Sequence, residues 1–327
     1  MLGRFFAIGL VLTTATVSVS EAREIAGMWS ASISDTRPGK LSFSLRYSRN
    51  DNSGSLGDLS DFEGLTSEQI GSKTRVPVEF ELQREAGAIH FEGLFKNGEV
   101  VGEFAYTPNE DFPRVLRSLG VEFAPKDGER DRELFQLALF DVSSAFIRSM
   151  QAIGYDESLE RYVEFRIFGV DPGYVRDMAA VGFPRLAASK LVETRIHGAT
   201  PEYIRTMRAS GEDLTLDQYI ESRIFQVTPE FANEMRAAGY PNLSRDRLVE
   251  FRIHGVSPEF IESLRKLGYR NIPADQLVAM RIHGVTPEFI RRVEAAGYHL
   301  VPVEKLVQMR IFDIDPKMVR ALDDAEN

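Results

Sequence analysis

The sequence predicts an α+β fold in which a small N-terminal antiparallel β-sheet domain is followed by an α-solenoid of two-helix repeats of about 29 residues. Two observations predict it. Apolar and polar residues alternate between residues 23 and 106, which is typical of half-buried strands. From Arg166 onward the dipeptide Arg-Ile recurs at intervals of 28 or 29 residues, which indicates a repeat array. We therefore expect a β domain at 23–108, joining helices with a degenerate repeat at 109–140, and the repeat array at 141–327.

Residues 1–22 have the composition of a secretory signal peptide. Arg4 gives a positive start, residues 5–19 are mostly apolar, and Ser20-Glu21-Ala22 fits a small-x-small cleavage site. An uncleaved membrane anchor is the alternative, but the apolar stretch contains several hydroxyl residues and is shorter than the roughly 20 apolar residues of a span. We expect cleavage after Ala22, no stable membrane insertion after cleavage, and a periplasmic or secreted protein.

Charge and cysteine content exclude several classes of function. The chain has 39 Lys and Arg against 49 Asp and Glu, for a net charge of -10. This sign opposes binding that depends on neutralising phosphates, so nucleic acid is not expected as a partner. The chain has no cysteine, which excludes disulfides, thiolate catalysis and cysteine-ligated zinc.

The β domain is expected to be an antiparallel meander of about five strands. Strands at residues 89–95 and 100–106 are joined by Asn97-Gly98, a pair that suits the positive backbone angles of a tight hairpin. Glu85-Ala86-Gly87 forms the preceding turn. The polar run at 48–55 and a short helical turn are expected as an insertion between the second and third strands.

The repeat array contains six units with a shared pattern, in which each proline follows an arginine by six residues. The arginines form what we call the arginine ladder: Arg166, Arg195, Arg223, Arg252, Arg281 and Arg310. The prolines are Pro172, Pro201, Pro229, Pro258, Pro287 and Pro316. In five units a glycine lies ten residues after the proline, and only the distance from that glycine to the next arginine varies.

Each unit is expected to contain two short helices. Thr286 can cap a first helix that begins at Pro287, Glu288 complements its positive end, and Gly297 stops it in the left-handed conformation. A second helix is expected from about residue 274, with Leu277, Val278 and Ile282 as its apolar positions. Helices of about ten residues are marginal alone, so the units must stack on one another.

Two units depart from the pattern. Residues 134–155 form a degenerate unit in which Ala138 replaces the arginine and Ser144 replaces the proline. In the unit at residues 201–225, Gly211-Glu212 replaces the Gly-aromatic pair of later units, and Gln226 replaces the glycine after the second helix. We expect this second unit to be the weakest in the array.

The repeats resemble a known family. The run LVEFRIHGVSPEFI at residues 248–261 and its counterpart at 278–290 resemble helical repeats of exported bacterial proteins. These include the extracytoplasmic repeat region of membrane metallopeptidase regulators of the β-lactam-sensor type. The resemblance covers about residues 76 to 327. The chain lacks a His-Glu-x-x-His motif and a transmembrane bundle, so the resemblance implies no peptidase activity, only an exported sensing or interaction module.

The repeated histidines are interpreted as structural. His197, His254 and His283 share one repeat position, which phenylalanine occupies at Phe168, Phe225 and Phe312. A position that accepts phenylalanine in half of the units is typical of packing at a helix end. Equivalent atoms of stacked units also lie about 8–10 Å apart, too far to share a zinc ion. No metal site and no cofactor is expected.

The arginine ladder is expected to make structural contacts. Each arginine can reach backbone carbonyls or a carboxylate in the first turn of a neighbouring first helix, at Glu202, Glu230, Glu259 and Glu288. A solvent-facing stripe that binds an anionic polymer is the alternative. Arg252 is expected to be partly buried and paired, with Arg265 as its exposed counterpart. Trp29, the only tryptophan, is expected in the core, with stacking on a surface ligand as the alternative.

No catalytic residues are expected, because no nucleophile elbow, phosphate loop, dinucleotide fingerprint or calcium loop occurs. The sequence therefore predicts an exported, non-enzymatic module that binds a protein partner, or senses one, through its repeat surface. A ligand-binding protein that uses the β domain for a glycan or an apolar molecule is the alternative. An unrecognised hydrolase is the third hypothesis.

Overall fold

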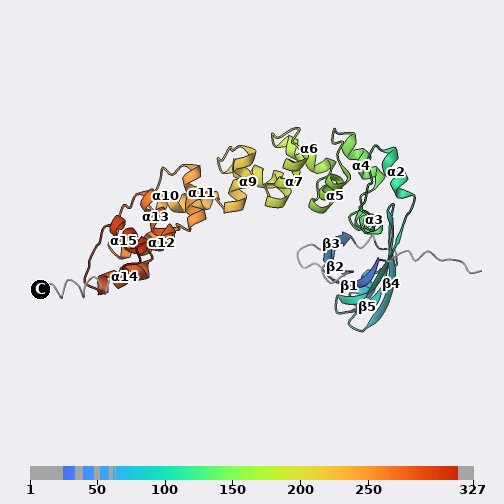
Figure 1. Cartoon of the computed structure of the whole chain (residues 1–327), viewed down its shortest axis with the longest axis horizontal. Helices are drawn as coiled ribbons and strands as arrows, with labels where there is room; N and C mark the ends of the chain where they lie inside the picture. Colours follow the sequence, from blue (N-terminus) through green and yellow to red (C-terminus); the bar gives the residue numbers. More distant parts are fainter. Residues whose placement is uncertain (1–24, 34–39, 48–51, 59–61, 63, 316–327) are drawn as a thin grey trace, which may run out of the picture. The chain divides into compact units, whose positions relative to one another are not determined.

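The computed structural model describes residues 25–33, 40–47, 52–58, 62 and 64–315. Its contacts divide the chain into two compact units, Met1–Ile167 and Phe168–Asn327. Figure 1 shows the strands, in blue and cyan, followed by a long series of short helices. The predicted α+β fold, with an antiparallel sheet before a series of helical repeats, is confirmed. The expected signal peptide and the helix expected at Pro316 lie outside the described residues.

The first unit contains a six-stranded antiparallel sheet rather than a meander of about five strands. The strands are β1 Ile25–Ile33, β2 Lys40–Arg46, β3 Asn52–Asp58, β4 Val76–Arg84, β5 Gly87–Lys96 and β6 Glu99–Pro108, in the order β3-β2-β1-β6-β5-β4. The additional strand β3 lies in the segment expected as a polar insertion. It joins the sheet through backbone pairing with β2, which needs no apolar alternation. The predicted hairpin at Asn97-Gly98 is confirmed, with both residues at positive φ.

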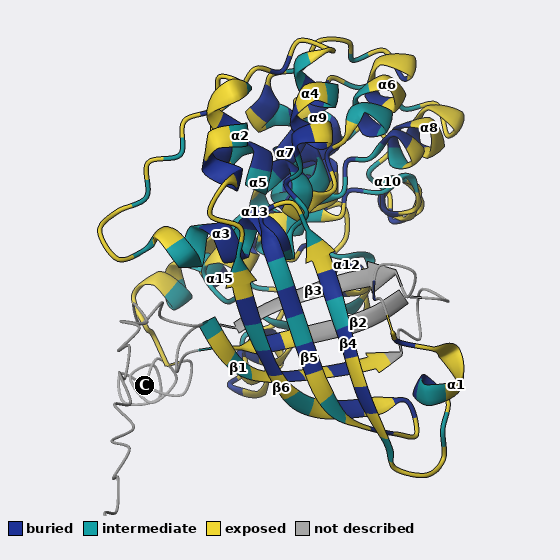
Figure 2. Ribbon diagram, turned by 90° about the vertical axis from the view of Figure 1, so that its right-hand side faces the viewer, coloured by how far each residue is buried: buried dark blue, intermediate teal, exposed yellow. Residues whose placement is uncertain are grey.

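Strand β1 lies between β2 and β6, so the sheet is not a simple meander. Trp29 on β1 is only 1% exposed, and its ring makes edge contacts with Phe80, Phe91 and Phe95. Its indole nitrogen donates a hydrogen bond to the carbonyl oxygen of Glu92 at 2.8 Å. Figure 2 shows the alternation of buried and exposed residues along β4, β5 and β6 that separates this core face from the outer face.

Four helices follow the sheet in the first unit, and one short helix is inserted in it. The inserted helix is α1 Ser67–Ile70, which begins with the capping box of Thr66 and Gln69. The later helices are α2 Phe112–Ser118, α3 Arg130–Leu139, α4 Ser144–Gln151 and α5 Leu159–Phe168. Phe135 of α3 stacks on Phe104 of β6, with ring centroids 5.8 Å apart, so α3 covers the core face of the sheet.

The turn between β4 and β5 binds the degenerate unit. The Glu85 carboxylate accepts hydrogen bonds from the Ser144 backbone amide and hydroxyl, both at 3.0 Å. Arg84 lies 3.5 Å from Asp141, and the same aspartate pairs with Arg166 at 2.7 Å. A proline at residue 144 could not donate the amide hydrogen bond. Serine therefore replaces the repeat proline at the position where the unit binds the sheet turn.

The second unit consists of alternating first and second helices. The first helices are α6 Pro172–Ala180, α8 Pro201–Ala209, α10 Pro229–Ala237, α12 Pro258–Lys266 and α14 Pro287–Ala295. The second helices are α7 Ala188–His197, α9 Leu216–Phe225, α11 Arg245–His254, α13 Ala274–Ile282 and α15 Val303–Ile311. Each of these five first helices begins at the predicted proline, and the residue before it, Asp, Ser or Thr, accepts a hydrogen bond from a first-turn amide. The predicted helix starts are confirmed.

Candidate functional site

The arginine ladder connects consecutive second helices. Each arginine places its guanidinium over the aromatic residue of the first helix that precedes it in the chain. The ring partners are Phe146, Tyr174, Tyr203, Phe231, Phe260 and Phe289, with distances from Cζ to the centroid between 3.7 and 5.3 Å. Four arginines also donate to the carbonyl that ends the previous second helix, at Phe140, Gly169, His254 and His283.

These contacts are structural in kind. A guanidinium over an aromatic face gains about 0.5–2 kcal/mol, and a cation at a helix C-terminus complements the helix dipole. Within the described residues no ion pair joins a ladder arginine to the expected partners Glu202, Glu230, Glu259 or Glu288. Three of these carboxylates, Glu230, Glu259 and Glu288, are instead stabilised by local hydrogen bonds. Hydrogen bonds from its own amide and from Thr228 hold the pKa of Glu230 below its ordinary value.

After several second helices a glycine makes room for the ladder. Gly198, Gly255 and Gly284 adopt φ values of 71°, 70° and 68°, in the left-handed region. A Cβ atom at Gly255 would lie 2.7 Å from Nη2 of Arg281. Gln226 occupies this position with φ 55° and does carry a side chain. The Nε atom of Arg252, which follows Gln226 in the ladder, is buried without a hydrogen-bond partner.

Two further arginines donate hydrogen bonds to the carbonyls at the C-terminal ends of first helices. Arg208 donates to the Val181 carbonyl at 2.7 Å, and Arg265 donates to the Ala238 carbonyl. The expectation that Arg265 is an exposed counterpart of Arg252 is therefore wrong, because its position in α12 brings it to the end of α10. No such arginine in the described chain reaches Gly211 at the end of α8, around which a Cβ would meet nothing within 4 Å.

One isoleucine per second helix is exposed, directly after the ladder arginine. Five of them form what we call the isoleucine ladder of the second unit: Ile196 (52% exposed), Ile224 (46%), Ile253 (53%), Ile282 (54%) and Ile311 (51%). Ile167, at the end of the first unit, is exposed to 47%. The sequence analysis placed Ile282 on the apolar face of its helix. The structure corrects this, because Leu277, Val278 and Met280 fill that face.

Consecutive second helices lie side by side, so the isoleucine ladder forms a row. Contacts join α7 to α9, α9 to α11, α11 to α13 and α13 to α15. Ion pairs cross between them: Lys190 lies 2.9 Å from Asp217, and Arg247 lies 2.6 Å from Asp275. Packed helices are about 8–10 Å apart, so the row presents one aliphatic side chain at each such interval.

The remaining sequence candidates lie elsewhere. His197, His254 and His283 are half-buried at the ends of second helices, beside the isoleucine ladder. Within the described residues, no three His, Asp or Glu side chains are gathered to hold a metal ion. Trp29 cannot serve as a stacking platform on the surface, because the aromatic core of the sheet encloses it.

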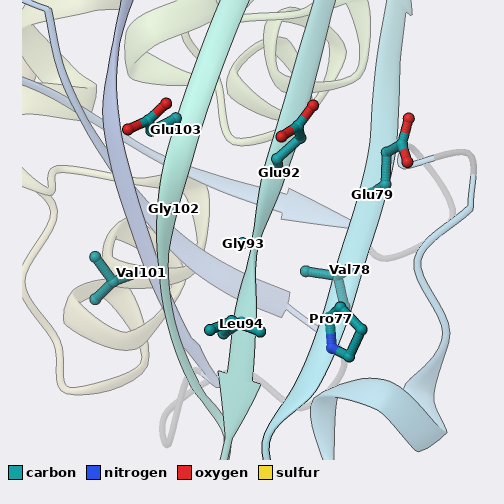
Figure 3. Close-up of a pocket in the computed structure, with 9 residues that line it drawn as sticks. All are labelled: Pro77, Val78, Glu79, Glu92, Gly93, Leu94, Val101, Gly102 and Glu103. Atoms are coloured by element: carbon teal, nitrogen blue, oxygen red, sulfur yellow. The ribbon is translucent and has the colours of Figure 1, made fainter.

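The outer face of the sheet contains an open groove, which the sequence analysis did not predict. It is about 660 Å³ in volume and crosses β4, β5 and β6. Figure 3 shows Glu79, Glu92 and Glu103 along one side and Pro77, Leu94 and Val101 along the other. The alternation of charged and apolar residues on these strands was visible in the sequence. The register of these strands, which aligns the glutamates with one another and the apolar residues with one another, could not be predicted from the sequence.

Comparison with protein-family models, curated proteins and solved structures finds no match for the chain. No helix in the described ranges is long and apolar enough to cross a membrane. The two surfaces described above, the isoleucine ladder and the groove on the sheet, are the candidate binding sites of the described chain.

Proposed function

We propose that the protein is an exported, non-enzymatic interaction module that binds a protein partner through the isoleucine ladder. The observation that carries this proposal is the half-exposed isoleucine at the same position of five successive second helices. Single exposed aliphatic residues are ordinary on a protein surface, whereas a row of them at one position of successive units favours a binding surface.

A partner that covers the isoleucine ladder gains free energy from apolar burial. Complete burial of an isoleucine side chain contributes about 1.5–3 kcal/mol, so covering the exposed half contributes about 1 kcal/mol per unit. A partner that covers the whole row gains several kcal/mol from apolar contact alone, before hydrogen bonds and association costs are counted. The gain grows with the number of units covered, as in repeat proteins that bind extended partners.

The repeat framework supports a binding role because its ladder arginines already contact aromatic rings within the array. The ladder arginines contact rings and carbonyls inside the array, which holds the neighbouring isoleucines at fixed positions. Preorganised side chains lose little conformational entropy on binding. Export is supported by the composition of residues 1–22, and an exported protein would meet its partner in the periplasm or outside the cell.

The test compares two double variants of the full-length protein in affinity purification from periplasmic extract. Ile253→Gln with Ile282→Gln changes the isoleucine ladder. Leu94→Gln with Val101→Gln removes two exposed aliphatic side chains from the sheet, and thus measures binding by the β domain separately. We expect the partner that binds the repeats to be lost with the ladder variant and retained with the sheet variant.

Circular dichroism and thermal midpoints establish that both variants are folded. Because all four side chains are about half-exposed or more, the substitutions should shift the midpoints little. A partner retained by the ladder variant and lost with the sheet variant would contradict the proposal and favour binding by the β domain.

A further inference from the structure

The groove on the outer face of the sheet is formed by two rows of side chains that run across the strands. Pairing of β4 with β5 and of β5 with β6 aligns Glu79, Glu92 and Glu103 as direct neighbours. The same register aligns Leu94 with Pro77 on one side and with Val101 on the other. One row of the groove is therefore acidic and the other is apolar, as Figure 3 shows.

The backbone of the intervening residues forms the floor. These residues are Val78, Gly93 and Gly102, and the Val78 side chain is buried on the core face. A Cβ atom on Gly102 would lie 2.6 Å from the indole nitrogen of Trp29. The same nitrogen donates to the carbonyl oxygen of Glu92. The buried tryptophan thus holds the strands beneath the groove, which makes the floor rigid.

Among the described residues, the one basic side chain that contacts the acidic row is His90. Like charges directly opposite each other on neighbouring strands destabilise a sheet. The His90 Nε2 atom lies 3.4 Å from Glu92 and 3.7 Å from Glu79, and Glu103 forms no ion pair within the described residues. A cationic partner would relieve this repulsion.

The apolar row requires the partner to be more than a cation. Leu94 is 52% exposed and Val101 is 62% exposed, and Met28, which pairs with Glu103 in the register, is 46% exposed. A small cation would leave these side chains in water, and an acidic lipid or peptide would be repelled by the glutamates. The combination fits a protein segment in which Lys or Arg side chains lie beside aliphatic ones.

The spacing favours a helix as that segment. Neighbouring strands are about 4.8 Å apart, so three carboxylates span about 10 Å. Residues three and four apart on a helix are separated by about 5–6 Å, which matches this spacing. We propose that the groove binds a basic amphipathic helix of a partner protein, with its cationic stripe on the glutamate row and its apolar stripe on Leu94 and Val101. This proposal is independent of the isoleucine ladder.

The test measures binding of a synthetic peptide of leucine and lysine, about 18 residues or five helical turns long. Fluorescence anisotropy gives its affinity for the full-length protein. The groove variant is Glu92→Gln with Glu103→Gln. The control variant, Glu68→Gln with Glu122→Gln, makes the same change in net charge at exposed positions that do not line the groove. An apolar variant, Leu94→Thr with Val101→Thr, keeps strand-forming residues.

We expect the groove variant and the apolar variant each to weaken binding about tenfold, and the control variant to change it less than about twofold. A peptide with glutamate in place of lysine should not bind. Because the groove variant removes like-charge repulsion, its thermal midpoint should be unchanged or higher, which separates loss of binding from loss of folding. Equal weakening by the groove and control variants would overturn the proposal, since it would show attraction to the overall negative charge only. Unchanged binding by the apolar variant would overturn it as well.

Discussion

Gln226 shows how one residue interrupts the pattern of the array. The equivalent positions are Gly169, Gly198, Gly255, Gly284 and Asp313, and all of them adopt positive φ. A residue with a side chain loses about 1–2 kcal/mol in this conformation, whereas glycine does not.

We therefore predict that Gln226→Gly stabilises the protein by about 1 kcal/mol, which raises the thermal midpoint by about 2–4 °C. The reverse change, Gly255→Gln, should lower the midpoint, because its Cβ would approach the guanidinium of Arg281. A lower midpoint for Gln226→Gly would show that the Gln226 side chain makes a stabilising contact that outweighs its backbone strain.

A second prediction concerns Arg252, whose guanidinium lies 3.7 Å from the centroid of Phe231. Arg252→Ala should destabilise the protein by about 1–2 kcal/mol through loss of the cation–π contact and of packing by the aliphatic stem. The expected loss is smaller than for a buried ion pair, since no opposite charge is left unpaired. Arg270→Ala, at an exposed position, is the control and should cost less than about 0.5 kcal/mol. Equal midpoints for the two variants would show that the ring contact contributes nothing.

At the scale of single residues, the sequence predicted the roles of those residues that act on their immediate neighbours in the chain. The prolines at helix starts and the glycines at helix ends act within one turn, so their roles follow from spacing. The exposure of Ile282 could not be predicted from spacing. Apolar residues at 277, 278 and 282 all fit one helical face until the neighbouring unit is placed. The burial of Trp29 was predicted and is confirmed, whereas its ring partners depend on which strands flank β1.

At the scale of elements, the turn between β4 and β5 is the joint between the sheet and the helices that follow it in the first unit. Ser144 is the first residue of α4, where proline is well tolerated by a helix. Ser143 before it is extended, with φ -90° and ψ 160°, which is also compatible with a following proline.

We predict that Ser144→Pro leaves α4 intact and removes both hydrogen bonds to Glu85, which should cost about 2–4 kcal/mol because the acceptor is charged. Ser144→Ala keeps the amide donor and should cost about half as much. Urea denaturation followed by circular dichroism gives both values. Equal stabilities for the two variants would show that the amide hydrogen bond to Glu85 does not contribute.

The unit at residues 201–225 differs from its neighbours in how its loop is held. In later units Tyr240 and Tyr269 donate from their hydroxyls to the carbonyls of Ile272 and Val301, at 2.7 and 2.8 Å. Here Glu212 takes the place of the tyrosine and lies 3.3 Å from Arg245. The Arg245 side chain is only 13% exposed, so the cost of removing its charge from water offsets much of the ion pair. This pair therefore contributes less than a packed aromatic ring with a hydrogen bond.

We predict faster hydrogen exchange for the amides of α8 and α9 than for those of α12 and α13, measured by mass spectrometry at neutral pH. Glu212→Tyr should slow the exchange, because the ring restores the contact made in later units. Similar protection of both helix pairs in the wild-type protein would exclude a flexing point in this unit.

Elements that depend on neighbouring residues in the chain were predicted from the sequence, and elements that depend on distant residues were not. Helices that begin with a capping residue and proline were predicted to the residue. Strand β3 was not, because its pairing with β2 uses backbone groups that any sequence supplies. The role of the β4–β5 turn was also hidden, since Glu85 and Ser144 are far apart in the chain and meet only in the folded first unit.

At the scale of the whole molecule, contacts group the sheet with the helices up to Ile167 in the first unit. The repeats from Phe168 onward form the second unit. The expected boundaries at residues 108 and 140 followed composition and repeat spacing, which do not register the contacts of Glu85 and Arg84 with the degenerate unit. The pattern that marks the repeats in the sequence, Arg-Ile, combines an arginine that holds the units together with an isoleucine that faces solvent.

The central claim, that the isoleucine ladder is the binding surface, is tested most directly by photo-crosslinking in the producing cell. A photo-reactive amino acid replaces Ile253 or Ile282 in the full-length protein, and Glu262, exposed on the first helix α12, is the control position. We predict that both ladder positions crosslink to the same partner protein and that position 262 does not. Absence of crosslinks at the ladder, or the same products at all three positions, would contradict the account.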